Sequence, residues 1–306
     1  MIYPDGKHYR SYDGYLKETF GGKTVRLPLD GGFTCPNLDG TKGRGGCRYC
    51  TKEPLPYRGL PLREQAAIAR QSLGKWRREG SEEQYIAYFQ VFTNTYAPPE
   101  RLEALYREAL AIPHVVGLSV ATRCDCLPNE TVSLLRRLDR ETHLTVELGL
   151  QTASDTTAAR IGRGHTTEEF LDGYHRLDGL KRTVHLINGL PGERRETMRE
   201  TARFVASLAP HGVKIHMLYL EEGTALTDEY RTTPFPLLTR EDYIETVVDQ
   251  LELLPPDTVI ERLTGDGNRH RLVAPRWTAD KRAVLNGIEG CFRRRGSCQG
   301  ERFVFS

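Results

Sequence analysis

Residues 24–50 read TVRLPLDGGFTCPNLDGTKGRGGCRYC, a short β-rich segment that runs directly into a glycine-rich loop with three cysteines. Cys35, Cys47 and Cys50 have the spacing Cys-x11-Cys-x2-Cys. Glycine tolerates positive φ and lets a backbone pass close to a compact group. A Cys-x2-Cys pair can place two thiolates on one metal centre. The loop therefore predicts a metal or cluster site directly after the first strand.

The number of cysteines in this loop limits the kind of centre. A closed structural zinc site and a fully cysteine-bound iron–sulfur cluster each need four ligands. A [4Fe–4S] cluster held by three cysteines leaves one iron open to an exogenous ligand. Two alternatives remain: a zinc loop completed by His8 or a remote cysteine, and three structural thiols. The chain has seven cysteines and no secretory signal, which favours metal or redox chemistry over a disulfide framework.

Beyond the loop, short β-rich runs alternate with amphipathic helical stretches. Such βα units bring successive strands in parallel, and they predict an open doubly wound sheet or a barrel. No Gly-x-Gly-x-x-Gly follows the first strand, which argues against a dinucleotide-binding fold. We expect strands at 24–29, 85–91, 115–120, 143–148, 183–187, 213–218 and 258–262, and helices at 62–78, 99–111, 129–140, 166–177, 195–208 and 240–254.

Composition and charge indicate the broad class of protein. The 306 residues are 38% hydrophobic and 27% charged, as in ordinary globular proteins. The N-terminus has no apolar core of a signal peptide, and no apolar run approaches the roughly 18 residues that span a membrane. We therefore expect a cytoplasmic protein. Residues 42–78 hold ten Lys and Arg against two acidic residues, and residues 261–302 hold ten against five. These segments suggest a polyanionic partner, or simply solvated helix faces.

Six phrases in order resemble the radical S-adenosylmethionine (SAM) superfamily. Their pattern is similar to the YhcC/YtqA-type subfamily, in the branch near the elongator catalytic subunit, and the resemblance runs from about residue 10 to the C-terminus. The phrases are GFTCPN (32–37), YFQVFTNT (88–95), VATR (120–123), VELGLQT (146–152), INGLP (187–191) and TGDG (264–267).

The resemblance implies an α/β fold, a partial (β/α)6 TIM-like barrel with the cluster at its mouth. It divides the chain into an N-terminal extension (1–23), the barrel core (24–262) and a short basic C-terminal extension packed on the barrel (263–306). It implies two cofactors, a [4Fe–4S] cluster and SAM. SAM chelates the open iron through its amino and carboxylate groups, and reduction cleaves it to methionine and a 5′-deoxyadenosyl radical. An electron donor such as flavodoxin or ferredoxin is then required.

The resemblance also indicates residues that contact SAM. Arg163 is expected to pair with the methionyl carboxylate, because a guanidinium forks across two oxygens. Glu147 is expected near the nucleoside, although a structural salt bridge is the alternative for this carboxylate. The predicted SAM-binding residues are Gln90, Thr93, Asn94, Thr122, Arg123, Glu147, Gln151, Arg163 and Asn188, and the metal ligands are Cys35, Cys47 and Cys50.

Two residues are candidates for catalysis. Asp266 can point at substrate from the last strand or belong to a turn, and His216, like His185, can be a core histidine. One departure from the family pattern is Cys124, where relatives read Thr-Arg-Pro-Asp-Cys. The pair Cys124-x-Cys126 can bind a second metal with Cys291 or Cys298, or consist of buried thiols.

The expected function is a radical SAM enzyme that acts on RNA. The resemblance implies transfer RNA (tRNA) and the wobble uridine, whose 5-carboxymethylaminomethyl side chain is converted to 5-aminomethyl. The chain lacks the acetyltransferase domain of the elongator catalytic subunit. The alternatives are a radical SAM enzyme on a small metabolite and a zinc-stabilised RNA-binding module. The sequence does not predict an oligomeric state.

Overall fold

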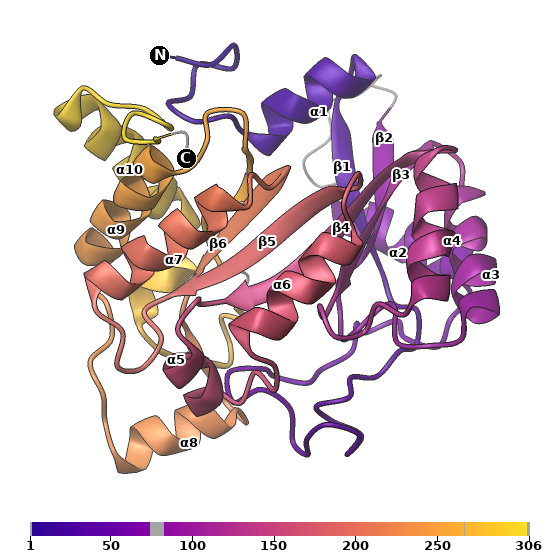
Figure 1. Ribbon diagram of the computed structural model, residues 1–306, viewed down its shortest axis with the longest axis horizontal. Coiled ribbons are helices and arrows are strands. Elements are labelled where there is room, and N and C mark those ends of the chain that lie inside the picture. The colour runs from indigo at the N-terminus through magenta and orange to yellow at the C-terminus, as the bar shows by residue number, and fades with distance from the viewer. Residues whose placement is uncertain (1, 74–82, 266, 305–306) are drawn as a thin grey trace.

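The computed structural model describes residues 2–73, 83–265 and 267–304 (Figure 1). Its centre is one parallel sheet of seven strands in the order β1-β2-β3-β4-β5-β6-β8. The predicted α/β partial barrel is confirmed, with the sheet curled into a half-barrel. The strands are β1 (Thr24–Leu29), β2 (Gln84–Phe89), β3 (Val115–Thr122), β4 (His143–Gln151), β5 (Lys181–Asn188), β6 (Gly212–Met217) and β8 (Val259–Arg262).

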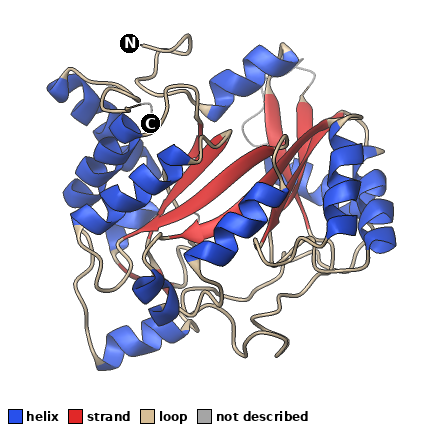
Figure 2. Cartoon of the chain, viewed as in Figure 1, coloured by secondary structure: helices blue, strands red, loops and turns tan. Residues whose placement is uncertain are grey.

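Helices cover the outer side of the curved sheet (Figure 2). A small antiparallel pair, β7 (Leu220–Glu221) with β9 (Leu272–Ala274), stands apart from the main sheet. The helices are α1 (Tyr12–Phe20), α2 (Leu62–Leu73), α3 (Pro99–Leu110), α4 (Asn129–Asp139), α5 (Asp155–Arg160), α6 (Thr167–Arg176), α7 (Arg195–Ser207), α8 (Ala225–Thr232), α9 (Arg240–Leu253) and α10 (Lys281–Arg295), with a 3-10 helix at Arg276–Ala279.

Alternation along β4 explains how the sheet has two different faces. Leu144, Val146 and Leu148 are fully buried in the apolar core beneath the helices. Because successive side chains of a strand point to opposite faces, Thr145 and Glu147 lie on the concave side. Polar side chains from the neighbouring strands meet Glu147 there. The concave face is therefore polar, and it is the side on which the cysteine loop gathers.

The long repeated elements agree with the sequence pattern. All seven predicted strands and all six predicted helices are present, with ends that differ by a few residues. Thr166 caps α6 and forms a capping box with Glu169, the arrangement that stabilises a helix start. The last part of the predicted helix 62–78, residues 74–78, lies outside the described residues.

Four helices were not predicted from the sequence: α1, α5, α8 and α10. The longest is α10, whose sequence KRAVLNGIEGCFRRR contains two glycines and weak helical periodicity. Tertiary packing overrides that weak propensity, because Val284, Ile288 and Phe292 are fully buried. The other three have fewer than ten residues, too few for a periodic pattern to show.

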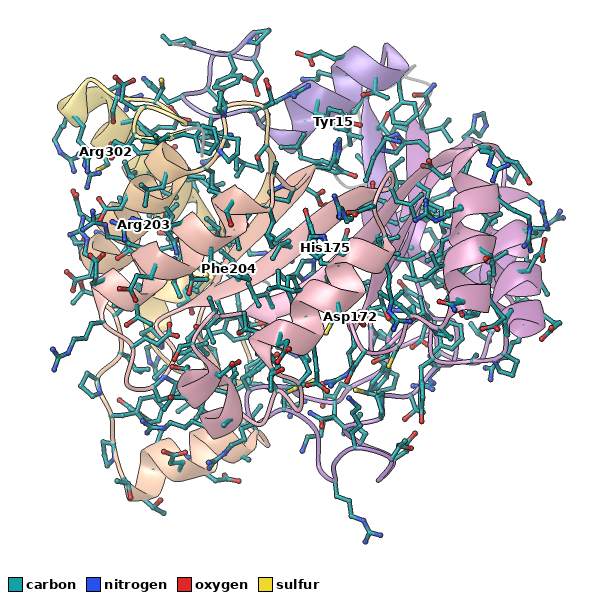
Figure 3. The ribbon with its side chains drawn as sticks, in the orientation of Figure 1. Tyr15, Asp172, His175, Arg203, Phe204 and Arg302 are labelled. Atoms are coloured by element: carbon teal, nitrogen blue, oxygen red, sulfur yellow. The ribbon has the colours of Figure 1, made fainter. Side chains whose placement is uncertain are left out.

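Helix α1 lies at the amino ends of the strands, where Tyr15 is labelled in Figure 3. The Tyr15 ring packs 5.0 Å from that of His211 and 5.9 Å from that of His143. The carboxyl ends of the strands and the long loop after β1 lie at the opposite end of the sheet (Figure 1).

Within the described ranges, no helix combines the length and apolar character that crossing a bilayer requires.

Candidate cluster and cofactor site

Cys35, Cys47 and Cys50 line one cavity of about 230 Å³ at the carboxyl ends of the strands. All three are free, partly buried thiols. The loop between them folds back on itself: the Leu38 amide donates to the Cys35 carbonyl over 2.7 Å, and the Gly46 amide donates to the Asn37 carbonyl over 2.8 Å. The structure thus brings the three predicted ligands to one hollow.

Asn37 fastens this loop to the turn after α5. Its Nδ2 donates to the Gly162 carbonyl over 2.7 Å and lies 3.5 Å from the Cys47 sulfur. Gly164, at φ +76°, leaves room for this amide, because a Cβ there would lie 2.5 Å from the Asn37 Oδ1. Asn37 was not predicted as a site residue, although it stands within the phrase GFTCPN.

The three thiols fit a cluster better than a single zinc ion. Burial raises the pKa values of Cys47 and Cys50, and each thiolate would repel its neighbours, so bound positive charge is needed to hold three thiolates together. Within the described part of the chain, no three His, Cys, Asp or Glu side chains are arranged for one metal ion. Cys35, Cys47 and Cys50 would hold an iron–sulfur cluster in this cavity, and its irons would supply that positive charge.

The zinc alternative with His8 as fourth ligand is wrong. His8 Nδ1 lies 2.6 Å from the Glu289 carboxylate, and its ring stacks on Phe292 of α10. This segment lies at the end of the molecule opposite the loop after β1 (Figure 1). His8 therefore belongs to the packing of the two chain termini.

Arg163 lines the cavity, and its side chain is bound mainly by protein acceptors. Its guanidinium, only 1% exposed, donates to the carbonyls of His165 (2.9 Å), Leu150 (2.6 Å) and Thr152 (2.7 Å), and to Asp155 (3.1 Å). These bonds use four of the five N–H donors of the guanidinium. Arg163 thus supports the wall of the cavity, a role that its position after β4 did not reveal.

Glu147 is likewise committed to protein partners, and the salt-bridge alternative is correct. Burial alone would raise its pKa, but Lys214 and Arg26 hold the pKa well below its usual range. The carboxylate is therefore an ionised acceptor whose lone pairs are taken up by donors from five strands. These donors are Arg26, Tyr88, Ser119, His185 and Lys214.

Two predicted asparagines also face the protein. Asn188 pairs with Gln250 of α9 through bonds of 2.7 and 3.0 Å, so its amide points into the helical layer. Asn94 Nδ2 donates to the Phe89 and Ala121 carbonyls and ties the loop after β2 to β3. Neither amide is placed to contact a ligand in the cavity.

Other predicted residues do line the cavity with the cysteines. Arg123 among them makes a two-bond contact with Asp125, at 2.8 Å each, and Thr122 bonds Thr95 over 2.5 Å. Within the described residues, no hydrogen bond reaches the side-chain amide of Gln90 or Gln151. Those two amides remain available to a ligand. The predicted residues on the cavity wall are Gln90, Thr93, Thr122, Arg123, Glu147, Gln151 and Arg163.

A second cavity, of about 210 Å³, adjoins the first. Tyr49, Gln151 and His185 line both, and His216 lines the second. A positive φ of 67° at Gln151, beside a register shift between β4 and β5, places this residue between the two spaces. Tyr49, which stands between two of the cysteines, was expected to stack on a base or to pack in the core, and not to line the cofactor cavity. Asp266, the other catalytic candidate, lies outside the described residues.

The remaining cysteines do not form a second metal site among the described residues. Cys124 and Cys126 are buried beside Asp125. Cys291 lies in the packing of α10, where its thiol donates to Glu245 over 3.3 Å, and Cys298 lies 3.5 Å from Glu301. The alternative of buried thiols therefore describes these residues.

This half-barrel, with three cysteines in the loop after its first strand, defines the class of protein. Residues 40–205 match the Radical SAM superfamily, and residues 210–294 match the Radical_SAM C-terminal domain. The chain belongs to the radical SAM superfamily. It is therefore an enzyme whose cofactors are a [4Fe–4S] cluster and SAM, and it needs a reductant. The zinc-stabilised RNA-binding module is excluded by this membership.

Two relatives cover nearly the whole chain. The uncharacterized protein YtqA of Bacillus subtilis is 40% identical over 300 residues, which are 97% of this chain and 93% of YtqA. Protein YhcC of Escherichia coli is 34% identical over 273 residues, 88% of this chain and 87% of YhcC. The predicted subfamily is confirmed.

A solved structure shows the same fold. Elp3 of the archaeon Methanocaldococcus infernus superposes with a TM-score of 0.63 at 19% sequence identity. The match covers 90% of this chain but only 64% of the Elp3 chain. The likeness thus supports the architecture of the barrel.

Proposed function

We propose that Cys35, Cys47 and Cys50 hold the cluster and that SAM occupies the cavity they line. The observation that carries this proposal is the meeting of three free thiols with two uncommitted amides, those of Gln90 and Gln151, around one hollow. When bound, the cluster and SAM supply a 5′-deoxyadenosyl radical that removes a hydrogen atom from substrate. Polar contacts to SAM come from these amides, while Arg163 and Asn94 hold the walls in place.

We further propose that the substrate is tRNA. Positive side chains border the opening of the cavity: Lys52 packs near Gly46, and Arg58 lies 5.1 Å from the centre of the Phe92 ring. Both Gly46 and Phe92 line the cavity. Lysine and arginine that neutralise phosphates provide the sequence-independent part of nucleic-acid affinity. The cations support an approach of the RNA backbone to this rim.

The C-terminal basic segment contributes less than its composition suggests. Arg294 and Arg295 pair with Glu245 of α9, and Arg295 also pairs with Asp249 at 2.9 Å. Their charge is offset within the layer of α9 and α10. Lys42 and Arg48 of residues 42–78 are also paired, with Asp125 and Glu229, and Arg58 Nε lies 4.0 Å from Asp30. Our proposal therefore relies on the positive side chains at the rim of the cavity and not on the net charge of either segment.

The proposed reaction is the conversion of the 5-carboxymethylaminomethyl side chain of wobble uridine to 5-aminomethyl. It rests on the resemblance to the YhcC/YtqA-type subfamily and the elongator branch. The required reductant is proposed to be flavodoxin or ferredoxin, a small protein able to deliver one electron at a time. A small metabolite as substrate is the competing proposal.

Nucleoside analysis of tRNA tests the substrate. In a strain that lacks this protein, we expect 5-carboxymethylaminomethyluridine to accumulate at the wobble position. The wild-type gene should restore the aminomethyl product, and the Cys47→Ala gene should not. Unchanged tRNA nucleosides in the deletion strain would favour the small metabolite instead.

Binding experiments test the rim independently of the reaction. Lys52→Glu and Arg58→Glu should each weaken tRNA binding and flatten its dependence on salt, because each neutralised phosphate releases counterion. Arg293→Glu is the matched control, an exposed arginine on α10. Equal loss of affinity in the control and the rim variants would contradict the proposed orientation of tRNA.

A further inference from the structure

The second cavity contains two histidines with unused ring nitrogens. The rings of His185 and His216 lie 5.8 Å apart, centre to centre, on the neighbouring strands β5 and β6. Within the described residues, no hydrogen bond reaches His216 or the Nδ1 of His185. Half-buried polar atoms that face a hollow without a protein partner indicate a ligand there. A volume of about 210 Å³ is that of roughly seven water molecules, enough for a side chain on a base.

The tautomer of His185 follows from its one partner. His185 Nε2 lies 2.8 Å from the Glu147 carboxylate. That carboxylate is ionised and can only accept, so Nε2 carries the proton and donates. Burial lowers the pKa of His185, with Lys214 lowering it further, and the imidazole is neutral at neutral pH. The Nδ1 atom of His185 then carries a free lone pair and can act as a base.

Charged groups around Glu147 fix the position of this carboxylate and of the His185 ring that donates to it. Lys214 on β6 and Arg26 on β1 contact Glu147, and Glu261 on β8 pairs with Arg26 and lies 3.8 Å from Lys214. Arg262 at the end of β8 adds a further positive charge near Lys214 and His216. The other ionisable side chains facing His185 are the Tyr49 and Tyr88 phenols and the His216 imidazole. A base held by a buried carboxylate is the arrangement that enzymes use for proton transfer.

We propose that the second cavity receives the reacting side chain of the substrate and that His185 transfers a proton to it, with Glu147 as the positioning residue. This inference rests on the proposed function. In the proposed reaction the side-chain nitrogen loses its carboxymethyl carbon and gains one hydrogen. Such a nitrogen needs a proton donor close by, and radical chemistry alone does not supply one.

In this reaction two electrons leave the carbon, and one proton passes through His185 to the nitrogen. The carbon gives up two electrons, one with the hydrogen atom taken by the 5′-deoxyadenosyl radical and one to an acceptor of the iron–sulfur class. Water then adds to this carbon, and its proton goes to His185 Nδ1. The N–C bond breaks, its electron pair stays on nitrogen, and nitrogen takes the proton back from His185. The added hydroxyl releases its own proton to solvent as the carbon leaves as an aldehyde.

The experiment compares His185→Ala with wild-type enzyme loaded with its cluster and SAM, using tRNA that carries the carboxymethylaminomethyl group. His185→Gln is a second variant of closer volume. His175→Gln is the control, a histidine on α6 whose side chain is 60% exposed (Figure 3). Three quantities are measured: iron content, 5′-deoxyadenosine formed, and aminomethyl product formed. Exogenous imidazole is then added to the His185→Ala enzyme.

We expect both His185 variants to keep iron and 5′-deoxyadenosine formation within about twofold, and to lose product roughly 100-fold or more. Imidazole should restore part of the product in His185→Ala, which a purely structural role would not allow. Product within threefold of wild type, loss of 5′-deoxyadenosine, or product loss that imidazole does not relieve would each overturn the role of His185. A wild-type enzyme that leaves this tRNA unchanged would instead refute the proposed function.

Discussion

Lys214 and Glu147 form an ion pair on the concave face of the sheet, where the two side chains are 1% and 0% exposed. They stand on β6 and β4, and β5 between them contributes His185 to the same carboxylate. A buried charge is tolerated only when it is paired and hydrogen-bonded. Paired charges therefore stabilise the interior of this barrel. The carboxyl ends of its strands are polar and can receive a ligand.

The first prediction concerns this charge balance. Lys214→Met leaves Arg26 to pair with both Glu147 and Glu261. We expect unfolding free energy to fall by about 3–5 kcal/mol, the usual effect of breaking a buried pair. Adding Glu147→Gln removes the buried negative charge that lost its partner and should recover at least half of the loss. Urea denaturation of the two variants measures both effects.

Lys181→Met is the matched control for that prediction. Lys181 pairs with Asp139 at 3.5 Å, and the two side chains are 34% and 22% exposed. A pair in contact with solvent contributes about 1 kcal/mol or less. Equal losses for Lys181→Met and Lys214→Met, or no recovery in the double variant, would contradict the importance of charge balance.

The second prediction concerns Arg163. A lysine has one ammonium group and cannot reach four separate acceptors, so Arg163→Lys leaves buried carbonyls without donors. We expect a loss of stability on the order of 3 kcal/mol, together with faster amide exchange in residues 151–167. Arg160→Lys, at an exposed pair with Glu229, should change stability by less than about 1 kcal/mol. If Arg163→Lys leaves stability unchanged and weakens SAM binding, Arg163 contacts SAM directly, as the resemblance implied.

Arg163 and Glu147 also show where prediction from the sequence stops. Regular βα spacing placed the strands, and parallel strands bring their carboxyl ends together, so the position of the site followed from the pattern. The partners of a side chain do not follow from its position along a strand. The Leu150 and Thr152 carbonyls that bind Arg163 become acceptors only once β4 ends in a turn, and Lys214 is 67 residues from Glu147 in sequence.

The cysteine loop was predictable for a different reason. Its ligands are close in sequence, and glycines at positive φ, such as Gly45 and Gly46, are a local requirement of the wrapping backbone. Asn37 was missed because its partner Gly162 lies 125 residues further along the chain. Local chemistry could be predicted from the pattern of residues, whereas contacts across the barrel needed the fold.

The third prediction is a dependence of stability on pH. Burial lowers the pKa of His143 to about 4, and Lys181 lowers it further, against an ordinary value of 6.5. The unfolded chain binds a proton near pH 6.5 and the folded chain only near pH 4, so stability falls as pH drops between these values. With allowance for partial exposure, we expect His143 to account for a loss of about 1–2 kcal/mol of unfolding free energy between pH 7 and pH 5.

His143→Gln should reduce this loss of unfolding free energy by the same amount, measured by urea denaturation at both pH values. The exposed His175→Gln serves as control. Because other groups titrate in wild type and variant alike, their contributions cancel in the difference. An identical pH dependence in wild type and His143→Gln would show that His143 does not carry the effect.

The fourth prediction separates the cluster ligands from the other thiols. Alanine at Cys35, Cys47 or Cys50 should each remove most of the bound iron and abolish 5′-deoxyadenosine formation, because the cluster loses one of only three protein ligands. Cys124→Ala removes a buried thiol 2% exposed and should keep iron and SAM cleavage, with a stability loss of about 1 kcal/mol. Iron and sulfide content per chain, visible absorption and 5′-deoxyadenosine yield measure the difference. Full iron content in Cys47→Ala would refute the ligand assignment, and loss of SAM cleavage in Cys124→Ala at wild-type stability would show that Cys124 takes part in the site.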